Sequence, residues 1–488
     1  MAKRKRHGAN GGETATDVAP KKKSKATEPA KSTEKPLVPE TIQLVAGSYD
    51  QVLHGMTAAV GAKGDVDFAD TFLFNAHTSA VRCVAVSPVS APAPGQTQKV
   101  LLASGSTDER INIYNLSAHP PSKKNQDVLA KVAPRPILEN PKNREVGTLL
   151  HHASTVTALH FPTRSKLLSA SEDSTIAVTR TRDWAVLSTI KVPKAKAHGR
   201  PSGDTAAFGA TPAGVNEFAI HPSMKVMISV SKGERCIRLW NLVTGKKAGV
   251  LGFSREMLQE AGEGKYSSGE GRTVVWGSAD GVDEYAVGFD RGVVVFGMDS
   301  VPKCIVVPSP PTKVHQLRYV TIDEEAGLSL LAVSTENGRI AFYSTKDDDL
   351  SAPKEEDDDE DDDGKSQPLK AAKLVGYVGG REAGVTSRIK DFVALPSAAN
   401  KGTLYVAGAS SEGKVRLWRL QTEELIAATA KAGSEGPMGK LLGTYETQNR
   451  ITCLAGFVMV PRPEGAEDSE DEVDDESEEE SDEGSDEE

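Results

Sequence analysis

A short pattern that recurs seven times most constrains how this chain can fold. Each copy has an acidic or amide residue (the marker), then a β-branched or leucine residue three positions later and, in five copies, an aromatic residue three positions after that. Spacings between successive markers are 58, 65, 61, 56, 47 and 75 residues. Because aromatic residues make up only 5% of the chain, their recurrence at one offset indicates a repeat protein. The markers are Asp50, Asp108, Asp173, Glu234, Asp290, Asn337 and Glu412, and Trp240 and Trp418 end the clearest copies.

Short β-rich runs bounded by Gly, Asn, Asp and Ser surround each marker, and no long stretch shows a convincing helical period. The short side chain of the marker suits a tight turn between two strands, where it can accept hydrogen bonds from backbone N–H groups. The strand after the turn is apolar on both faces, so it must lie between two packed sheets. Each unit is therefore predicted to be an antiparallel sheet of four strands, a to d, that buries its faces against neighbouring units.

The two ends of the repeat array predict how it closes. The first unit lacks strand a, because the run Ile42–Gly47 before Asp50 already takes the place of strand b. At the other end, the apolar run 450–458 has no unit of its own. If this run supplies the missing strand, the ring closes and leaves no exposed edge. We therefore predict an all-β protein, a seven-bladed β-propeller over residues 41–460, closed by N-terminal strands b, c and d and a C-terminal strand a.

The uneven spacings place four insertions. Residues 117–145 and 345–369 are predicted to join strands c and d of the second and sixth blades, whereas 191–213 and 253–271 join one blade to the next. These two kinds of connection emerge on opposite faces of a propeller. Basic side chains in two of the insertions are candidate contacts for RNA or protein partners: Lys123, Lys124, Lys131, Arg135, Lys142 and Arg144 on one face, and Lys191, Lys194, Lys196 and Arg200 on the other.

The formal net charge of −11 hides a basic body. Residues 464–488 hold 17 acidic residues, residues 347–363 hold 12 with one lysine, and the rest of the chain has 57 basic against 40 acidic residues. Residues 1–40 and 461–488 carry few large apolar side chains, so we predict disordered tails there and a disordered acidic insertion within 345–369. The acidic stretches could serve solubility, could contact basic partners such as ribosomal proteins or histones, or could screen against non-specific RNA binding.

Both tails contain short motifs. Two basic clusters near the N-terminus are typical of a nuclear-import signal or of an arm that contacts nucleic acid. They consist of Lys3, Arg4, Lys5 and Arg6, and of Lys21, Lys22, Lys23 and Lys25. In the acidic tail, Ser469, Ser477 and Ser485 each have an acidic residue three positions later, as an acid-directed kinase would require. Phosphorylation there would add further negative charge.

Motifs for catalysis or metal binding are absent from the sequence. It has no G-x-x-x-x-G-K-[ST], G-x-S-x-G or H-E-x-x-H motif and no cysteine–histidine spacing typical of zinc. We therefore expect no enzymatic activity, no metal, no cofactor and no small-molecule substrate. The sequence also lacks a run of 18 apolar residues, so a membrane span is not expected.

Several segments resemble the "maintenance of killer" WD-repeat family, whose animal relatives were described as interacting with an actin-regulating protein kinase. The segments are Gly47–Asp50, Leu102–Glu109, Ala219–Ser223, Ile237–Leu242, Gly245–Ala248 and Asn449–Leu454. The resemblance covers roughly residues 41–460 and implies no catalytic residues. It implies a nucleolar scaffold needed for assembly of the large (60S) ribosomal subunit and for pre-rRNA maturation, bound as a monomer to the pre-ribosomal particle and to a ribosomal-like protein in it. A cytoplasmic adaptor that negatively regulates a protein kinase is the alternative, and histone binding through the acidic segments is a third.

Histidines precede three blades, at His77, His152 and His198. In WD-repeat proteins a histidine at this position typically joins a buried chain of hydrogen bonds with a serine or threonine of strand b and the marker of the turn. The resemblance therefore implies that His77 bonds Ser104 or Ser106 and Asp108, in a structural rather than catalytic role.

Overall fold

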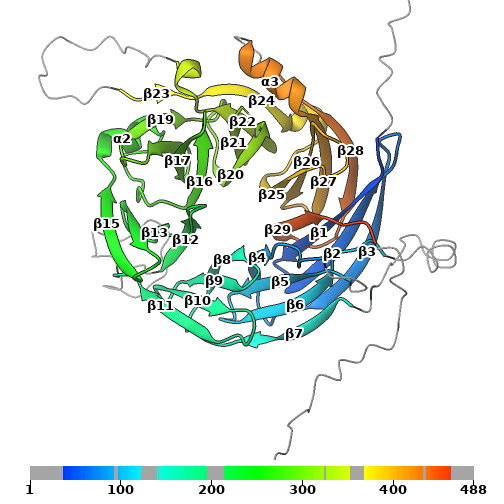
Figure 1. The fold of residues 1–488 in the computed structure, drawn as a ribbon. Helices are drawn as coiled ribbons and strands as arrows, with labels where there is room; N and C mark the ends of the chain where they lie inside the picture. The colour runs from blue at the N-terminus through cyan, green and yellow to red at the C-terminus, as the bar shows by residue number, and fades with distance from the viewer. Residues whose placement is uncertain are drawn as a thin grey trace, which may run out of the picture. The chain divides into compact units, whose positions relative to one another are not determined.

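The structure is a computed structural model in which residues 37–92, 97–121, 140, 142–194, 214–323, 326–351, 368–431 and 436–462 are described. All of them belong to the second of two compact units, Leu37–Glu488. Seven antiparallel sheets are arranged around a common centre, as Figure 1 shows. The predicted seven-bladed β-propeller is therefore confirmed.

The blades are numbered by their markers, and each has strands a to d from the centre outward. Blades 1 to 3 contain β29 (Ile451–Val458), β1 (Glu40–Ser48), β2 (Val52–Val60) and β3 (Val66–Asn75); β4 (Val81–Val86), β5 (Lys99–Ser106), β6 (Ile111–Ser117) and β7 (Arg144–Leu149); and β8 (Val156–Thr163), β9 (Lys166–Ser171), β10 (Thr175–Arg180) and β11 (Val186–Lys191). Blades 4 and 5 contain β12 (Val215–Ile220), β13 (Val226–Ser231), β14 (Cys236–Asn241) and β15 (Lys246–Gly252); and β16 (Thr273–Ala279), β17 (Val282–Gly288), β18 (Val293–Gly297), β19 (Pro302–Val306) and β23 (Lys370–Ala371). Blades 6 and 7 contain β20 (Val314–Asp323), β21 (Leu328–Thr335), β22 (Arg339–Ser344) and β24 (Lys373–Gly379); and β25 (Ile389–Pro396), β26 (Thr403–Ser410), β27 (Lys414–Gln421) and β28 (Lys440–Glu446).

The C-terminal strand closes the ring as predicted. Strand β29 pairs antiparallel with β1, from Ile42 opposite Val458 to Ser48 opposite Ile451. The seven innermost strands then form a continuous circle, because each one contacts the next: β29, β4, β8, β12, β16, β20, β25 and again β29. Figure 1 shows these strands surrounding the centre.

The repeated pattern forms the packing between blades. The residue three positions after each marker is 0% exposed in all seven blades: Leu53, Ile111, Ile176, Ile237, Val293, Ile340 and Val415. The position three residues further on is also buried in every blade, including blades 1 and 3, where Met56 and Thr179 replace the aromatic residue. Burial of one such apolar side chain contributes about 1.5–3 kcal/mol, so the pattern supplies a layer of stabilisation on each side of strand c.

The strand order defines two faces of the propeller. The turns from strand b to strand c, and the connections from strand d of one blade to strand a of the next, lie on one face, which we call the marker face. The other connections lie on the opposite face, which we call the termini face because the first and last described segments lie there. Leu37 donates its backbone N–H to Ala62, and Val460 donates its own to Ala118, and both acceptors lie in c–d connections.

The four predicted insertions join the predicted strands, but two details differ from the sequence-based expectation. Blade 5 has a fifth strand, because β23 from the insertion of blade 6 pairs in parallel with β19. Short helices also occur, although no helical period was evident: α2 (Arg255–Glu260), α3 (Thr422–Ala430) and the 3₁₀ turns η2 (Asp347–Asp349) and η3 (Arg381–Ala383). Segments this short have too few turns to show a clear apolar periodicity. Among the described residues, no helix combines the length and apolar character needed to cross a membrane.

Candidate interaction surface at the centre of the marker face

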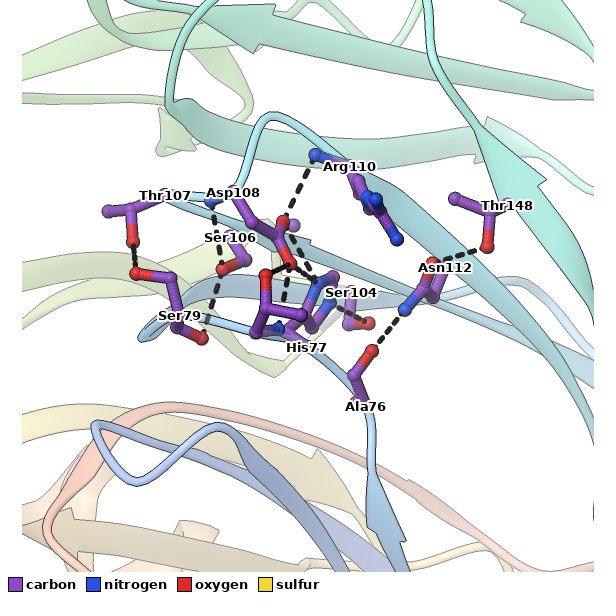
Figure 2. Close-up of polar contacts among 12 residues, drawn as sticks. Ala76, His77, Ser79, Ser104, Ser106, Thr107, Asp108, Arg110, Asn112 and Thr148 are labelled. Carbon is purple, nitrogen blue, oxygen red and sulfur yellow. Dashed lines mark hydrogen bonds and ion pairs between the residues drawn. The ribbon is translucent and has the colours of Figure 1, made fainter.

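The hydrogen-bonded chain expected at His77 is present. Its Nε2 lies 2.8 Å from Oγ of Ser104, and its Nδ1 lies 3.1 Å from Oδ2 of Asp108 (Figure 2). Asp108 also accepts hydrogen bonds from the backbone N–H groups of Thr78 at 3.0 Å and Arg110 at 3.1 Å. Burial lowers the pKa of His77, although the Asp108 carboxylate opposes this shift, so the imidazole is mainly neutral at pH 7. This chain satisfies buried polar groups and is fully engaged in holding the turn.

Other blades hold their turns in related ways. His152 contacts Ser169 at 2.7 Å and Asp173 at 3.2 Å in blade 3, and Trp240 donates its indole N–H to Ser229 at 2.8 Å in blade 4. In blades 4 and 7 the marker is a glutamate that pairs with an arginine four residues later. The markers Asp108, Asp173, Glu234 and Glu412 are thus engaged in local structure.

The basic residues proposed from the insertions do not form one site. Lys142 donates from Nζ to Thr97 at 3.0 Å, and Arg144 is exposed in β7 near the termini face. Lys191 and Lys194 are exposed near the marker face. The remaining candidates lie outside the described residues: Lys123, Lys124, Lys131, Arg135, Lys196 and Arg200, the import clusters Lys3, Arg4, Lys5, Arg6, Lys21, Lys22, Lys23 and Lys25, the serines Ser469, Ser477 and Ser485, and His198.

Sequence reasoning missed a group of basic side chains that converge from four blades. They lie at the start of inner strands β29, β4, β20 and β25, where these strands meet the marker face. We call this group the central basic cluster: Arg82, Lys313, Arg388, Lys390 and Arg450. Burial, followed by the positive charges of the other four members, lowers the pKa of Lys390 to about 8. A basic residue at the start of each of these strands was the available sequence signal, but the five are spread over the whole chain.

The position of this group is set by a β-bulge that recurs in six blades. The second residue of the inner strand is skipped in the pairing with strand b in every blade except blade 5. A bulge leaves one residue unpaired and re-aims its side chain. The bulge residues are Thr452, Arg82, Thr157, Asn216, His315 and Lys390, in blades 1, 2, 3, 4, 6 and 7.

In three blades the bulge side chain ties one blade to the next. The hydroxyl of Thr452 donates to the carbonyl of Val81 at 2.6 Å, and that of Thr157 donates to the carbonyl of Val215 at 2.7 Å. In blade 4, Asn216 donates to the carbonyl of Gly271 at 2.8 Å. Short polar side chains at the bulge therefore stabilise the contact between neighbouring inner strands.

In blades 2, 6 and 7 the bulge residue is basic and makes no such tie. Within the described part of the chain, Arg82, His315 and Lys390 have no side-chain hydrogen bond or ion pair, and Nε2 of His315 is buried. Burial, followed by the charges of nearby lysines and arginines, lowers the pKa of His315 to about 3, so this ring is neutral at pH 7.

Acidic groups near the ring axis do not neutralise this cluster. Asp391 is hydrogen-bonded by the backbone N–H of Leu454 at 2.8 Å and pairs with Arg318 at 3.3 Å. Glu217 accepts from the backbone N–H of Val274 at 3.2 Å, and burial raises the pKa of its carboxyl to about 8. One carboxylate is therefore engaged elsewhere, and the other is mainly protonated at pH 7.

A polar cleft of about 810 Å³ adjoins the cluster on the marker face. Its lining comes from the marker turns of blades 5 and 6 and from the connections on either side of blade 6, and Lys313 belongs to both cleft and cluster. Lys313 pairs with the marker Asp290 at 3.0 Å. The lining carries both signs of charge: Arg291, Lys313, Arg339 and Arg381, and Asp290, Glu336 and Glu382.

Comparison with known proteins agrees with this architecture. The model of the "WD domain, G-beta repeat" family matches residues 69–115 and 143–178. Protein MAK11 of Saccharomyces cerevisiae is 28% identical over 84% of this chain and 82% of its own length. The p21-activated protein kinase-interacting protein 1-like proteins of Danio rerio and Gallus gallus are each 26% identical, over 87% and 85% of this chain and 83% and 80% of their own lengths. Over most of its length the chain is similar to proteins of the MAK11 WD-repeat family.

A WD-repeat β-propeller is typically a non-catalytic scaffold. The described residues contain no group of three or more histidine, cysteine, aspartate or glutamate side chains placed to hold a metal ion. The polar chains at His77 and His152 hold turns, whereas Arg82, Arg388 and Lys390 have no ion-pair partner among the described residues. The central basic cluster is therefore the feature best suited to bind a partner.

Proposed function

We propose that the chain is a non-enzymatic scaffold in assembly of the large (60S) ribosomal subunit and in pre-rRNA maturation. It acts in the nucleus and nucleolus, as a monomer that binds pre-ribosomal proteins and RNA. The similarity to MAK11 supports this role, because the family resemblance implies a scaffold that binds the pre-ribosomal particle. The observation that carries the proposal is the central basic cluster, in which Arg82, Arg388 and Lys390 have no ion-pair partner among the described residues.

This arrangement favours binding of an anionic partner. Like charges that are held together by a rigid ring repel one another, and a partner with negative charge relieves that repulsion as it binds. Charge complementarity of this kind also accelerates and orients association. We expect association with the particle to weaken as the salt concentration rises.

Affinity purification of the tagged full-length chain tests this role. The chain should recover precursors of the large subunit with their RNA, and its depletion should cause precursor rRNA of that subunit to accumulate. A variant with Arg82→Gln, Arg388→Gln and Lys390→Gln should recover at least about fivefold less particle, because the unpaired charges are gone. A chain that recovers no ribosomal precursor, and whose loss leaves rRNA maturation unchanged, would contradict the proposal.

The matched control changes three exposed lysines of blade 4 and of the connection that follows it, all outside the cluster and outside the candidate contacts. Lys246→Gln, Lys247→Gln and Lys265→Gln remove the same formal charge from exposed positions. This variant should recover the particle almost as well as the unmodified chain. Equal losses in both variants would show that only the net charge matters.

A second candidate function is binding and negative regulation of a protein kinase. It is supported by the names of the animal relatives, which describe interaction with p21-activated protein kinase. Localisation distinguishes the two candidates. A tagged chain that accumulates in the nucleolus, and leaves it when Lys3, Arg4, Lys5 and Arg6 are changed to alanine, supports the first. A chain that stays in the cytoplasm with both import clusters intact, and co-purifies with a kinase, supports the second.

A further inference from the structure

We propose that the central basic cluster and the adjoining cleft form a docking site for an acidic segment of a partner protein. The segment would bind as an extended chain whose carboxylates pair with Arg82, Arg388 and Lys390. This inference rests on the proposed scaffold function and deepens it, because it names the chemical class of partner that the site takes.

The first support is that the basic residues are not required to build the ring. Blades 1, 3 and 4 use Thr452, Thr157 and Asn216 at the bulge to bind the next inner strand. At the same position Arg82 and Lys390 make no hydrogen bond or ion pair within the described residues. At this position a long, charged side chain gives up the hydrogen bond to the next blade that a short polar side chain makes. We therefore expect the charged side chains of Arg82 and Lys390 to make a different interaction, with a partner.

The second support is the uncompensated charge. Lys390 lies close enough to Arg82, Arg388, Lys313 and Arg450 for their charges to disfavour its own protonation. Among these five, Lys313 has a carboxylate partner, Asp290. Carboxylates delivered by a ligand would meet several donors at once, and such charge-assisted hydrogen bonds are roughly twice as strong as neutral ones.

The third support distinguishes a peptide from RNA. The cleft lining mixes acidic residues with basic ones, so a phosphate backbone, which is negative at every unit, would meet carboxylates there. The acidic residues are Asp290, Glu336 and Glu382, and the basic ones are Arg291, Lys313, Arg339 and Arg381. A peptide can place backbone N–H groups against the carboxylates and acidic side chains against the basic residues. Single-stranded RNA also needs aromatic faces for stacking. Tyr49, which is 59% exposed, lies next to the cluster, but the guanidinium of Arg450 already lies over its ring at 5.5 Å.

A partner is favoured over the acidic tail of the chain itself. The last described residues leave the ring on the termini face, where Nδ1 of His119 lies 3.0 Å from the carbonyl of Val460. The tail therefore starts on the face opposite the cluster. A segment from another protein can reach the marker face directly.

Fluorescence anisotropy with the full-length chain tests the proposal. The probes are a labelled peptide of alternating glutamate and serine residues and a labelled oligouridylate of similar length. The unmodified chain should bind the peptide more tightly than the RNA. The variant with Arg82→Gln, Arg388→Gln and Lys390→Gln should bind the peptide at least about tenfold more weakly, whereas the Lys246→Gln, Lys247→Gln, Lys265→Gln control should stay within about twofold.

Three results would overturn the proposal. The oligouridylate could bind more tightly than the peptide and lose its affinity in the same variant, which would assign the site to RNA. The control could lose as much affinity as the cluster variant, which would show non-specific attraction. The peptide could bind only after residues 463–488 are removed, which would assign the site to the tail of the chain.

A crosslinking measurement on the unmodified chain guards against misfolding of the cluster variant. A photoreactive group within the acidic peptide should mark residues of blades 2, 6 and 7 on the marker face, and crosslinks confined to other blades would refute the assignment. Failure of this proposal is separable from failure of the proposed function. A chain that associates with the pre-ribosomal particle but ignores the peptide refutes only the docking site.

Discussion

Thr452 donates its hydroxyl to the carbonyl of Val81 over 2.6 Å, and so joins the last strand of the chain to the inner strand of blade 2. The same hydroxyl lies 3.0 Å from the carbonyl of Gly47 in blade 1. One side chain therefore connects the N-terminal sheet, the C-terminal strand and the neighbouring blade. Closure of the ring depends on this contact at the centre as well as on the pairing of β29 with β1.

Truncation before residue 450 should open the ring. The change removes β29 with its buried side chains Ile451, Leu454 and Phe457, and leaves the edge of β1 unpaired. An exposed apolar edge strand promotes aggregation, so the product should be largely insoluble. Soluble yield and the cooperativity of thermal unfolding measure the effect. A soluble product that unfolds in one cooperative transition would refute the closure described here.

A smaller change at the same seam should be measurable in a folded protein. Thr452→Val keeps the shape of the side chain but leaves the carbonyl of Val81 without this donor, so unfolding free energy should fall by about 1–2 kcal/mol. Thr157→Val removes the equivalent bond between blades 3 and 4 and should cost a similar amount. Chemical denaturation compares the two. If Thr452→Val alone is neutral, the bond at the seam does not contribute to closure.

The sequence predicted the number of blades and the closure because both depend on a local pattern that recurs. The marker and the apolar residue after it lie only three positions apart in the chain, and burial of that residue is the same in every blade. Strand β23 was not predictable in this way. It has only two residues, and its pairing with β19 depends on the path of the insertion in space.

The central basic cluster could not be predicted for a related reason. Its members are separated by long stretches of sequence, and single basic residues beside a strand are common on protein surfaces. Only the ring brings Arg82 and Lys390 together, and only the bulge pattern shows that their side chains occupy a position used elsewhere for structural bonds. The insertion residues Lys142 and Lys191 were more visible in the sequence because they lie near other basic residues, and the structure places them near opposite faces, as the two kinds of connection predicted.

Asp108→Ala should destabilise the fold markedly. The change removes the acceptor for Nδ1 of His77 and for the backbone N–H groups of Thr78 and Arg110, and leaves these donors without a partner. The expected loss of unfolding free energy is about 2–3 kcal/mol. Asp183→Ala, which removes an exposed aspartate from a turn of blade 3, serves as the control and should change stability little. Equal effects of the two substitutions would show that the chain at His77 contributes nothing beyond an ordinary turn.

Glu217 should make stability depend on pH in a direction opposite to that of most carboxyl groups. Burial raises the pKa of Glu217 from 4.5 to about 8, so the folded state favours the protonated form. Its contribution to stability is fully present below pH 4.5 and is lost as the pH rises through 8. Glu217→Gln keeps the neutral form at every pH, and it should therefore abolish a decline of up to about 3 kcal/mol between pH 5 and pH 8. Thermal unfolding across this range measures the difference. The exposed Glu424→Gln variant should follow the unmodified chain, and a Glu217→Gln variant that does so too would contradict the assignment.

Excision of the acidic insertion should leave the propeller intact, because its ends already meet. Ser351 and Ala371 exchange backbone hydrogen bonds at 3.0 and 3.3 Å, so a shorter loop can join them without strain. Deletion of residues 355–363 should change unfolding free energy by less than about 0.5 kcal/mol, since these nine acidic residues bring no apolar side chain to the core.

Leu369→Asp provides the contrast, because Leu369 packs against the core of blades 4 and 5 and its backbone N–H donates to Glu260 at 2.7 Å. This substitution should cost about 1–2 kcal/mol and should increase amide hydrogen exchange along β19, whose outer edge β23 covers. Hydrogen exchange measured by mass spectrometry resolves the two variants. Faster exchange at β19 in the deletion, with none in Leu369→Asp, would mean that the acidic residues rather than β23 protect this edge.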